Sequence, residues 1–190
     1  MQIPYKHSEN IKLNQHLKPA TSAQIEAQQV VIILVPEKPG KAVWDLLACA
    51  DVLKPRYRQL QKLPGDSSCL ETDLPNRRGT RVLLQTMDSD ASTFEYLSTA
   101  RQLAAAAGKH NPASLLLQIS GFSTATATRL LDAMVAALLA SVCPMPNFKS
   151  DADKPAALGQ IDIYGLTEKV DLAPVQAEAV GNHLARWLAA

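Results

Sequence analysis

One short run of residues restricts the fold of this chain more than any other. Residues 30–35 read Val-Val-Ile-Ile-Leu-Val, and Pro36 and the Pro39–Gly40 pair end the run. β-Branched side chains favour extended backbone, and a strand that is apolar on both faces has to be covered on both faces. The run therefore predicts a central β-strand with helices on either side of its sheet.

Helical and extended patterns alternate along most of the chain. Helices are predicted where apolar residues recur every three or four positions, and strands where a short run is apolar or alternating. The expected elements are a helix over residues 41–53 stopped by Lys54–Pro55, paired strands over 68–74 and 80–87, a helix from a Ser92–Glu95 capping box to a closing Gly108, a strand over 115–119, a helix capped by Ser123 or Thr124 and ending near Val142, a strand over 159–165, and a last helix over 171–190. This order predicts an α/β fold, a three-layer α/β/α sandwich with a mixed sheet.

The length of 190 residues suits one well-buried domain and is short for two. Residues 1–27 are polar and contain Pro4 and Pro19, so we expect a flexible or edge lead-in. Residues 28–170 are expected to form the α/β domain, and residues 171–190 its closing helix.

The same periodicity predicts which side chains face the core. The expected inward residues are Val43, Leu46, Leu47 and Ala50 in the first helix; Phe94, Leu97, Leu103, Ala104 and Ala107 in the second; and Ala127, Leu130, Leu131, Met134, Val135, Leu138 and Val142 in the third. In the last helix Val180, Leu184, Trp187 and Leu188 form one apolar stripe, and His183 falls on the face expected to be exposed.

Charge and cysteine content limit the classes of function. With 19 basic and 18 acidic residues, the formal charge of +1 gives no broad field for nucleic acid or an anionic membrane. The basic clusters Lys54–Arg58 and Arg77–Arg81 are interpreted as solvated charges in preference to a phosphate-binding patch. No signal-peptide core opens the chain, and its scattered cysteines (Cys49, Cys69 and Cys143) suit buried thiols of a cytoplasmic protein.

The turn at Gly121–Ser123 lies between a buried strand and a helix, where α/β hydrolases carry a catalytic serine. That serine stands in Gly-x-Ser-x-Gly, and Ala125 occupies the place of the second glycine. Asp162 and His183 follow in the chain order of a triad, but His183 is expected on an exposed helix face. We therefore interpret Ser123 as a helix cap. Binding of an anion or nucleotide at the same helix N-terminus stays open as an alternative.

The remaining motifs are incomplete. Pro39–Gly40–Lys41 matches the end of a phosphate loop, but the upstream glycine is absent and Ala42 replaces the hydroxyl residue that would hold magnesium. Asp151 and Asp153 have no second pair of carboxylates to build a two-metal site. The histidines show no paired-ligand spacing; they are His7, His16, His110 and His183. We predict no catalytic, cofactor-binding or metal-binding residue in this chain.

The closing helix carries the most specific resemblance to a known family. Residues 179–188 read Ala-Val-Gly-Asn-His-Leu-Ala-Arg-Trp-Leu. This resembles the interdomain helix of the leucyl aminopeptidase family, where a Gly-x-x-Leu-Ala-Arg-x-Leu pattern leads into an Asn-x-Pro-Pro-Asn turn. The segments Ser68–Pro75 and Arg81–Leu84 resemble the paired strands that precede the first long helix of that family. The similarity spans about residues 25–190.

This resemblance implies a fold similar to that of macro domains, in the non-catalytic N-terminal domain of a two-metal exopeptidase that releases N-terminal amino acids from peptides. The two divalent ions, zinc or manganese, and an Asn-Thr-Asp-Ala-Glu-Gly-Arg motif would belong to a C-terminal catalytic domain, and this chain lacks that motif. The implied partners are that catalytic domain, further copies in a hexamer and a peptide substrate, with no nucleic acid and no membrane. The alternative is a stand-alone macro-like module that binds ADP-ribose or a related nucleotide at Gly121–Ser123.

The last helix also lacks an ordinary end. Asp171 and Pro174 suit its start, but it closes on Trp-Leu-Ala-Ala, which is apolar and uncapped. We therefore expect a connector truncated before the peptidase domain. Val180, Leu184 and Leu188 are expected to pack on this domain, and Trp187 to face the missing part.

Overall fold

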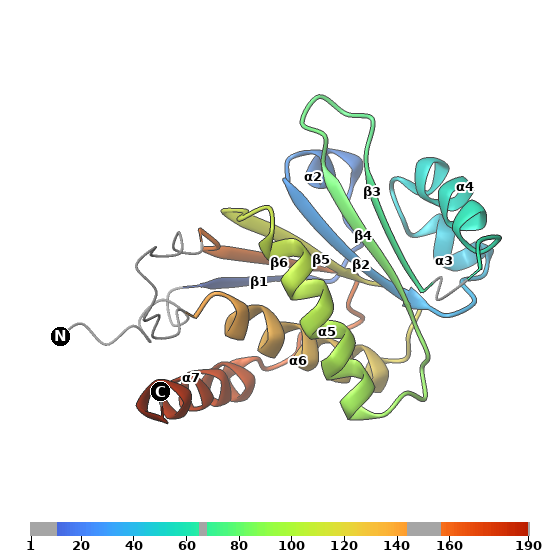
Figure 1. Cartoon of the computed structure of the whole chain (residues 1–190). Coiled ribbons are helices and arrows are strands. Elements are labelled where there is room, and N and C mark those ends of the chain that lie inside the picture. The colour runs from blue at the N-terminus through green and yellow to red at the C-terminus, as the bar shows by residue number, and fades with distance from the viewer. Residues whose placement is uncertain (1–10, 65–67, 144–156, 190) are drawn as a thin grey trace.

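The structure is a computed structural model that describes residues 11–64, 68–143 and 157–189, except the side chains of Trp187 and Ala189. Its elements are β1 (Lys12–His16), α2 (Ser22–Glu26), β2 (Val30–Pro36), α3 (Lys41–Asp45), α4 (Ala50–Leu60), β3 (Cys69–Asp73), β4 (Arg81–Met87), α5 (Thr93–Gly108), β5 (Ser114–Ile119), α6 (Thr124–Ser141), β6 (Gln160–Tyr164) and α7 (Ala173–Ala189). They confirm the predicted fold class, because one mixed sheet lies between two layers of helices (Figure 1).

The sheet has six strands in the order β1-β6-β5-β2-β4-β3. β2 pairs in parallel with β5 on one side and with β4 on the other, and its residues from Val30 to Val35 are buried. β3 runs antiparallel to β4, as the predicted hairpin requires. The prediction of a buried central strand is therefore confirmed, and β1 adds a parallel edge strand beside β6.

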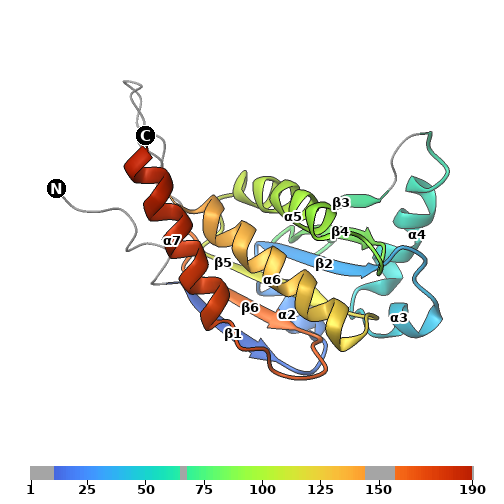
Figure 2. The ribbon, with the colours of Figure 1, turned by 90° about the horizontal axis from the view of Figure 1, so that it is seen from below.

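Alternate residues of the strands point to opposite faces and divide the core into two clusters. Ile32 and Leu117 belong to the cluster that packs under α5 and α6, on the face where α7 also lies (Figure 2). Ile33 and Leu116 belong to the cluster on the other face, with α3 and α4. Each large apolar side chain buried in this way contributes about 1.5–3 kcal/mol, so both helical layers are held mainly by burial.

Side chains cap the starts of three helices. In α5, Ser92 Oγ accepts the N–H of Glu95 at 3.3 Å and the Glu95 carboxylate accepts the N–H of Ser92 at 2.8 Å, so the predicted capping box is confirmed. Thr21 and Gln24 form a second capping box at α2. Ser123 caps α6 by accepting a backbone N–H at 3.3 Å. These contacts satisfy donors that have no partner within a helix.

α6 matches its prediction most closely. Its seven predicted inward side chains are all buried, and the helix is covered on one side by α5 and on the other by α7 (Figure 2). No helix in the described part of the chain is both long and apolar enough to cross a membrane.

The predicted helix over residues 41–53 is wrong in two respects. The segment forms two helices, α3 and α4, separated by a turn, and α4 continues through Pro55. Proline removes one N–H and crowds one carbonyl, and here burial of Leu53 and Tyr57 on the same helix offsets that cost. The turn also leaves Leu46, predicted to face inward, exposed at the surface.

Two details of α5 also differ from the prediction. Phe94, expected inward, is 73% exposed, and Tyr96 takes the buried position instead. The Tyr96 hydroxyl donates to carbonyls of the preceding loop at 3.0 and 2.8 Å, which fixes the rotation of the first turn. Gly108 is the last helical residue and not the residue after the helix; the left-handed residue that follows is Asn111, with φ 40°.

α7 turns a different face toward the sheet from the one predicted. Val175 and Ala179 pack against the core, and His183, four residues further on, is only 5% exposed. Leu184 and Leu188, expected to pack on the domain, are 37% and 71% exposed. The prediction for these three side chains is therefore wrong.

The start of α7 sets this rotation. Leu172 is buried immediately before the helix, and the Asp171 carboxylate accepts the N–H of Ala173 at 3.0 Å. Val175, Ala179 and His183 come three, seven and eleven positions after Leu172 and therefore lie on the same face of the helix. His183 consequently faces the core despite its polarity. Val180 lies half-buried beside this face. The side chain of Trp187 lies outside the described residues, so its predicted exposure stays a prediction.

Candidate functional site

The three residues considered as a serine triad have separate partners. Ser123 Oγ donates to Thr126 Oγ1 at 3.0 Å and caps α6, as predicted. Asp162 lies in β6. Its carboxylate accepts hydrogen bonds from the side-chain amide of Asn14 in β1 at 2.8 Å and from that of Gln160 in β6 at 2.9 Å. His183 lies on α7, with burial and nearby Arg186 lowering its pKa. The described contacts do not bring Ser123, Asp162 and His183 together.

The turn after β5 is closed by a side chain from another segment. Gly121 adopts φ 87°, and a Cβ built on it would lie 2.6 Å from Val43 Cγ2 and 3.0 Å from Pro36 Cδ. Val43 therefore packs into the place between the ends of β2 and β5, where the strand order changes direction. Such switch points are the usual ligand crevices of open α/β sheets. A nucleotide bound at Gly121 would have to displace Val43, and the ADP-ribose alternative stays a prediction.

The buried polar side chain of Gln118, next to this turn, has hydrogen-bond partners within the chain. The buried Gln118 amide donates to the carbonyl of Leu46 at 3.2 Å and to Ser120 Oγ at 3.0 Å. Its oxygen accepts the N–H of Ala20 at 3.3 Å. These bonds tie β5 to the turn between α3 and α4 and to the segment before α2, so they position the loops that surround the end of the sheet.

The histidines and cysteines are dispersed in the structure as in the sequence. His16 stacks on Tyr164 with ring centroids 4.4 Å apart, and His110 lies in the loop after α5. Burial raises the pKa of the Cys49 thiol to about 11. Cys69 is exposed and Cys143 is half-buried, so the prediction that all three thiols are buried is wrong. His7, Asp151 and Asp153 lie outside the described residues.

A pocket of about 450 Å³ lies just beyond the carboxyl end of β2. It opens between the β2–α3 loop and α4, and we call it the basic pocket. Its lining residues are Lys38, Pro39, Lys41, Trp44, Lys54, Tyr57, Arg58 and Gln61. The Pro39–Gly40–Lys41 segment and the Lys54–Arg58 cluster, which the sequence presents as unrelated features, meet at this pocket.

The charged residues of the basic pocket are all cations. Lys38 and Lys41 come from the β2–α3 loop and the start of α3, and Lys54 and Arg58 come from α4. Ion pairs found within the described residues belong to Arg81, and none involves these four side chains. Acidic residues on the same segments stay outside the lining; they are Glu37, Asp45 and Asp51.

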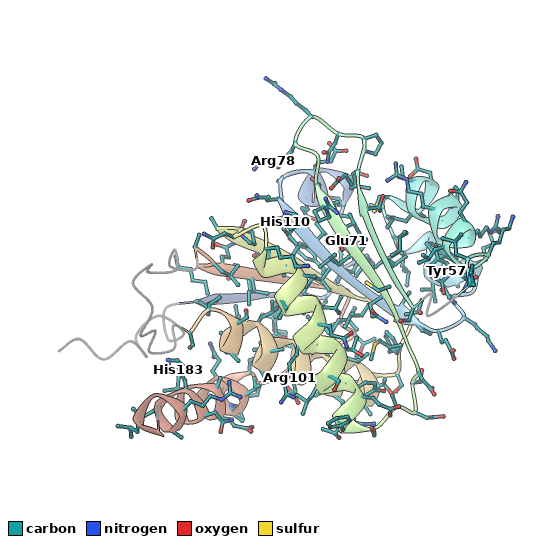
Figure 3. The ribbon with its side chains drawn as sticks, viewed as in Figure 1. Tyr57, Glu71, Arg78, Arg101, His110 and His183 are labelled. Atoms are coloured by element: carbon teal, nitrogen blue, oxygen red, sulfur yellow. The ribbon has the colours of Figure 1, made fainter. Side chains whose placement is uncertain are left out.

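Two buried aromatic residues hold the walls of the basic pocket together. The rings of Trp44 and Tyr57 meet with centroids 5.8 Å apart at 49°. The Tyr57 hydroxyl donates to the carbonyl of Glu37 at 3.4 Å and accepts from the Gln61 amide at 2.6 Å. This hydroxyl thus connects α4 to the loop that carries Lys38. In Figure 3, Tyr57 lies at the opposite end of the molecule from His183 on α7.

The sequence contains only part of the signal for this pocket. The motif at Lys41 and the cluster at Lys54 are visible as patterns, but Lys38 and Trp44 stand out by neither spacing nor composition. The pocket depends on the turn between α3 and α4. The sequence predicts a single helix over this segment and therefore misses the turn.

No three His, Cys, Asp or Glu side chains gather as a metal site in the described part of the chain. The expectation that two divalent ions, zinc or manganese, belong to a separate catalytic domain stays a prediction.

The chain is similar in fold to a solved peptidase structure. A mutant of tomato leucine aminopeptidase superposes on it with a TM-score of 0.64 at 17% sequence identity. The superposition covers 92% of this chain and 36% of that one, so the chain spans about a third of the length of the solved structure. No family model and no curated protein matches the chain. The similarity establishes the α/β fold that the two share.

Proposed function

We propose that this chain is the non-catalytic N-terminal domain of a leucyl-aminopeptidase-like protein whose further domain hydrolyses peptides. The observation that carries the proposal is the fold similarity, which uses 92% of this chain but only 36% of tomato leucine aminopeptidase. The rest of that neighbour is long enough for a separate catalytic domain. The resemblance of residues 179–188 to the interdomain helix of the family supports the same assignment.

The outer face of α7 supports a role in assembly. Leu184 and Leu188 are exposed on this face, while the opposite face of the helix covers the core through Val175 and Ala179. Neighbouring apolar side chains left at the surface commonly mark a contact area. In the proposed full-length protein the catalytic domain covers this face. The domain then contributes to a cytoplasmic oligomer and to the access of peptides, and the two metal ions belong to the catalytic domain.

The test compares the 190-residue chain with the protein extended through its downstream reading frame. Both are incubated with leucine p-nitroanilide and Mn²⁺ or Zn²⁺, and release of p-nitroaniline is followed. We expect metal-dependent release from the extended protein and none from the chain alone. Metal-dependent hydrolysis by the chain alone, or an extended protein that is folded but inactive on every aminoacyl substrate, would overturn the proposal.

A further inference from the structure

We propose that the basic pocket binds a small ligand that carries two or more linked phosphate groups. The proposal is independent of the peptidase assignment, because it rests on residues of this domain alone. Its starting observation is that four cations and no carboxylate line one cavity of about 450 Å³. Lys38 comes from the β2–α3 loop, Lys41 from the start of α3, and Lys54 and Arg58 from α4, so the arrangement is produced by the fold and not by one run of basic sequence.

The charge of the pocket indicates a multivalent anion. A sphere of 450 Å³ is about 10 Å across, close to the Debye length of about 8 Å at physiological ionic strength, so a ligand inside it interacts with all four cations. A single carboxylate would leave most of this positive charge unneutralised. Two or three linked phosphates carry about three to five negative charges near neutral pH and match it.

The donor types also suit phosphate. Arg58 can offer the paired N–H groups that bind two oxygens of one phosphate, whereas Lys38 on the loop and Lys41 at the start of α3 are exposed and act as point charges. Lys54 is half-buried on α4 and contributes from the wall. The lining holds no carboxylate that would coordinate Mg²⁺, so the structure favours a metal-free phosphate chain.

Contacts within the chain join the walls of the pocket. Trp44 and Tyr57 are buried beneath it, and the Tyr57 hydroxyl links α4 to the backbone of the β2–α3 loop at Glu37. A preformed site loses less conformational entropy on binding than a site that must first be ordered. The position at the carboxyl end of β2 is also a common one for ligands of α/β domains.

Fluorescence gives a direct binding assay. The chain has two tryptophans, so Trp187→Phe leaves Trp44, in the pocket lining, as the single reporter. We expect sodium tripolyphosphate to change the Trp44 emission saturably, with an affinity that decreases as NaCl is raised. The same Kd should be obtained by calorimetry on the unmodified chain.

Matched variants test whether the pocket holds the ligand. The double variant Lys54→Gln/Arg58→Gln removes two charges from the wall and is expected to raise the Kd by about tenfold or more. The control Arg101→Gln/Lys169→Gln removes two exposed charges elsewhere and should change the Kd less than twofold. If the first variant does not fold, as judged by circular dichroism, it is replaced by Lys38→Gln/Lys41→Gln, which changes two exposed side chains.

Parallel titrations with ATP and citrate define the ligand. Tighter binding of ATP than of tripolyphosphate supports a nucleotide as the source of the phosphate chain, and the reverse order supports free oligophosphate. Citrate binding as tightly as tripolyphosphate would overturn the phosphate assignment. The proposal also fails if no saturable change occurs at millimolar tripolyphosphate, or if the control variant loses as much affinity as the pocket variant.

Discussion

Replacing Gly121 by alanine tests whether Val43 closes the crevice between β2 and β5. The backbone at Gly121 has φ 87°, where a Cβ costs roughly 1–2 kcal/mol. The added methyl would also meet Val43 Cγ2 at 2.6 Å, and overpacking of this kind typically costs about 1–3 kcal/mol. The lower entropy of the unfolded alanine chain returns about 0.4–1 kcal/mol. Gly121→Ala should therefore lower the free energy of unfolding by roughly 1–4.5 kcal/mol.

Urea denaturation followed by circular dichroism measures this loss. With an m-value of about 2 kcal/mol/M, the midpoint should fall by about 0.5–2 M. Gly181→Ala is the matched control, because Gly181 is inside α7 with no atom within 4 Å of the added methyl. That control should raise stability by about 0.5–1 kcal/mol, since glycine is a poor helix former.

A double-mutant cycle separates the two costs. In Gly121→Ala/Val43→Ala the two methyl groups nearest the new Cβ are gone, so the overpacking share of about 1–3 kcal/mol should be recovered while the backbone strain remains. The pair should be less destabilised than the sum of the single variants. Additivity within about 0.5 kcal/mol would refute the contact and with it the conclusion that Val43 fills this crevice.

Two further predictions concern His183 and Ser123. Burial lowers the pKa of His183 in the folded protein, whereas the pKa of an unfolded histidine is about 6.5. The unfolded chain therefore binds more protons as the pH falls from about 7.5 through 6.5 toward the folded-state pKa. Over this range the unmodified protein should lose stability relative to His183→Leu. Urea titrations at pH 5.5, 6.5 and 7.5 check this, and parallel pH dependences of the two proteins would contradict it. Ser123→Ala should lower the free energy of unfolding by about 1 kcal/mol, because the side-chain cap of α6 is lost. The unmodified protein should not react with a fluorophosphonate probe. Labelling at Ser123 would show that it is a nucleophile.

The parts of the fold that the sequence predicts are those where one local signal dominates. The run Val30–Val35 is apolar on both faces, and it became the central strand β2. The Ser92–Glu95 capping box and the regular apolar spacing of α6 likewise combine a start signal with a clear period. In each case propensity, pattern and burial favour the same structure, so tertiary packing had nothing to override.

The errors occur where packing outweighs local pattern. Pro55 predicts the end of a helix, yet α4 continues past it because buried residues before and after the proline anchor the helix. On α7 the larger apolar residues, Leu184 and Leu188, form the more regular stripe, but the buried Leu172 fixes the rotation and brings His183 inward. When two faces of a helix are both partly apolar, periodicity predicts that the helix is amphipathic but does not predict which face packs on the core.

The basic pocket and the outer face of α7 lie at opposite ends of the molecule, as the labelled positions of Tyr57 and His183 show (Figure 3). A domain that covers Leu184 and Leu188 from the α7 side would therefore leave the α3–α4 end open. Phosphate binding at the basic pocket and contact of α7 with a catalytic domain can therefore be tested independently. Loss of phosphate binding in the Lys54→Gln/Arg58→Gln variant should leave the peptidase activity of the extended protein intact, and a parallel loss of activity would contradict this separation.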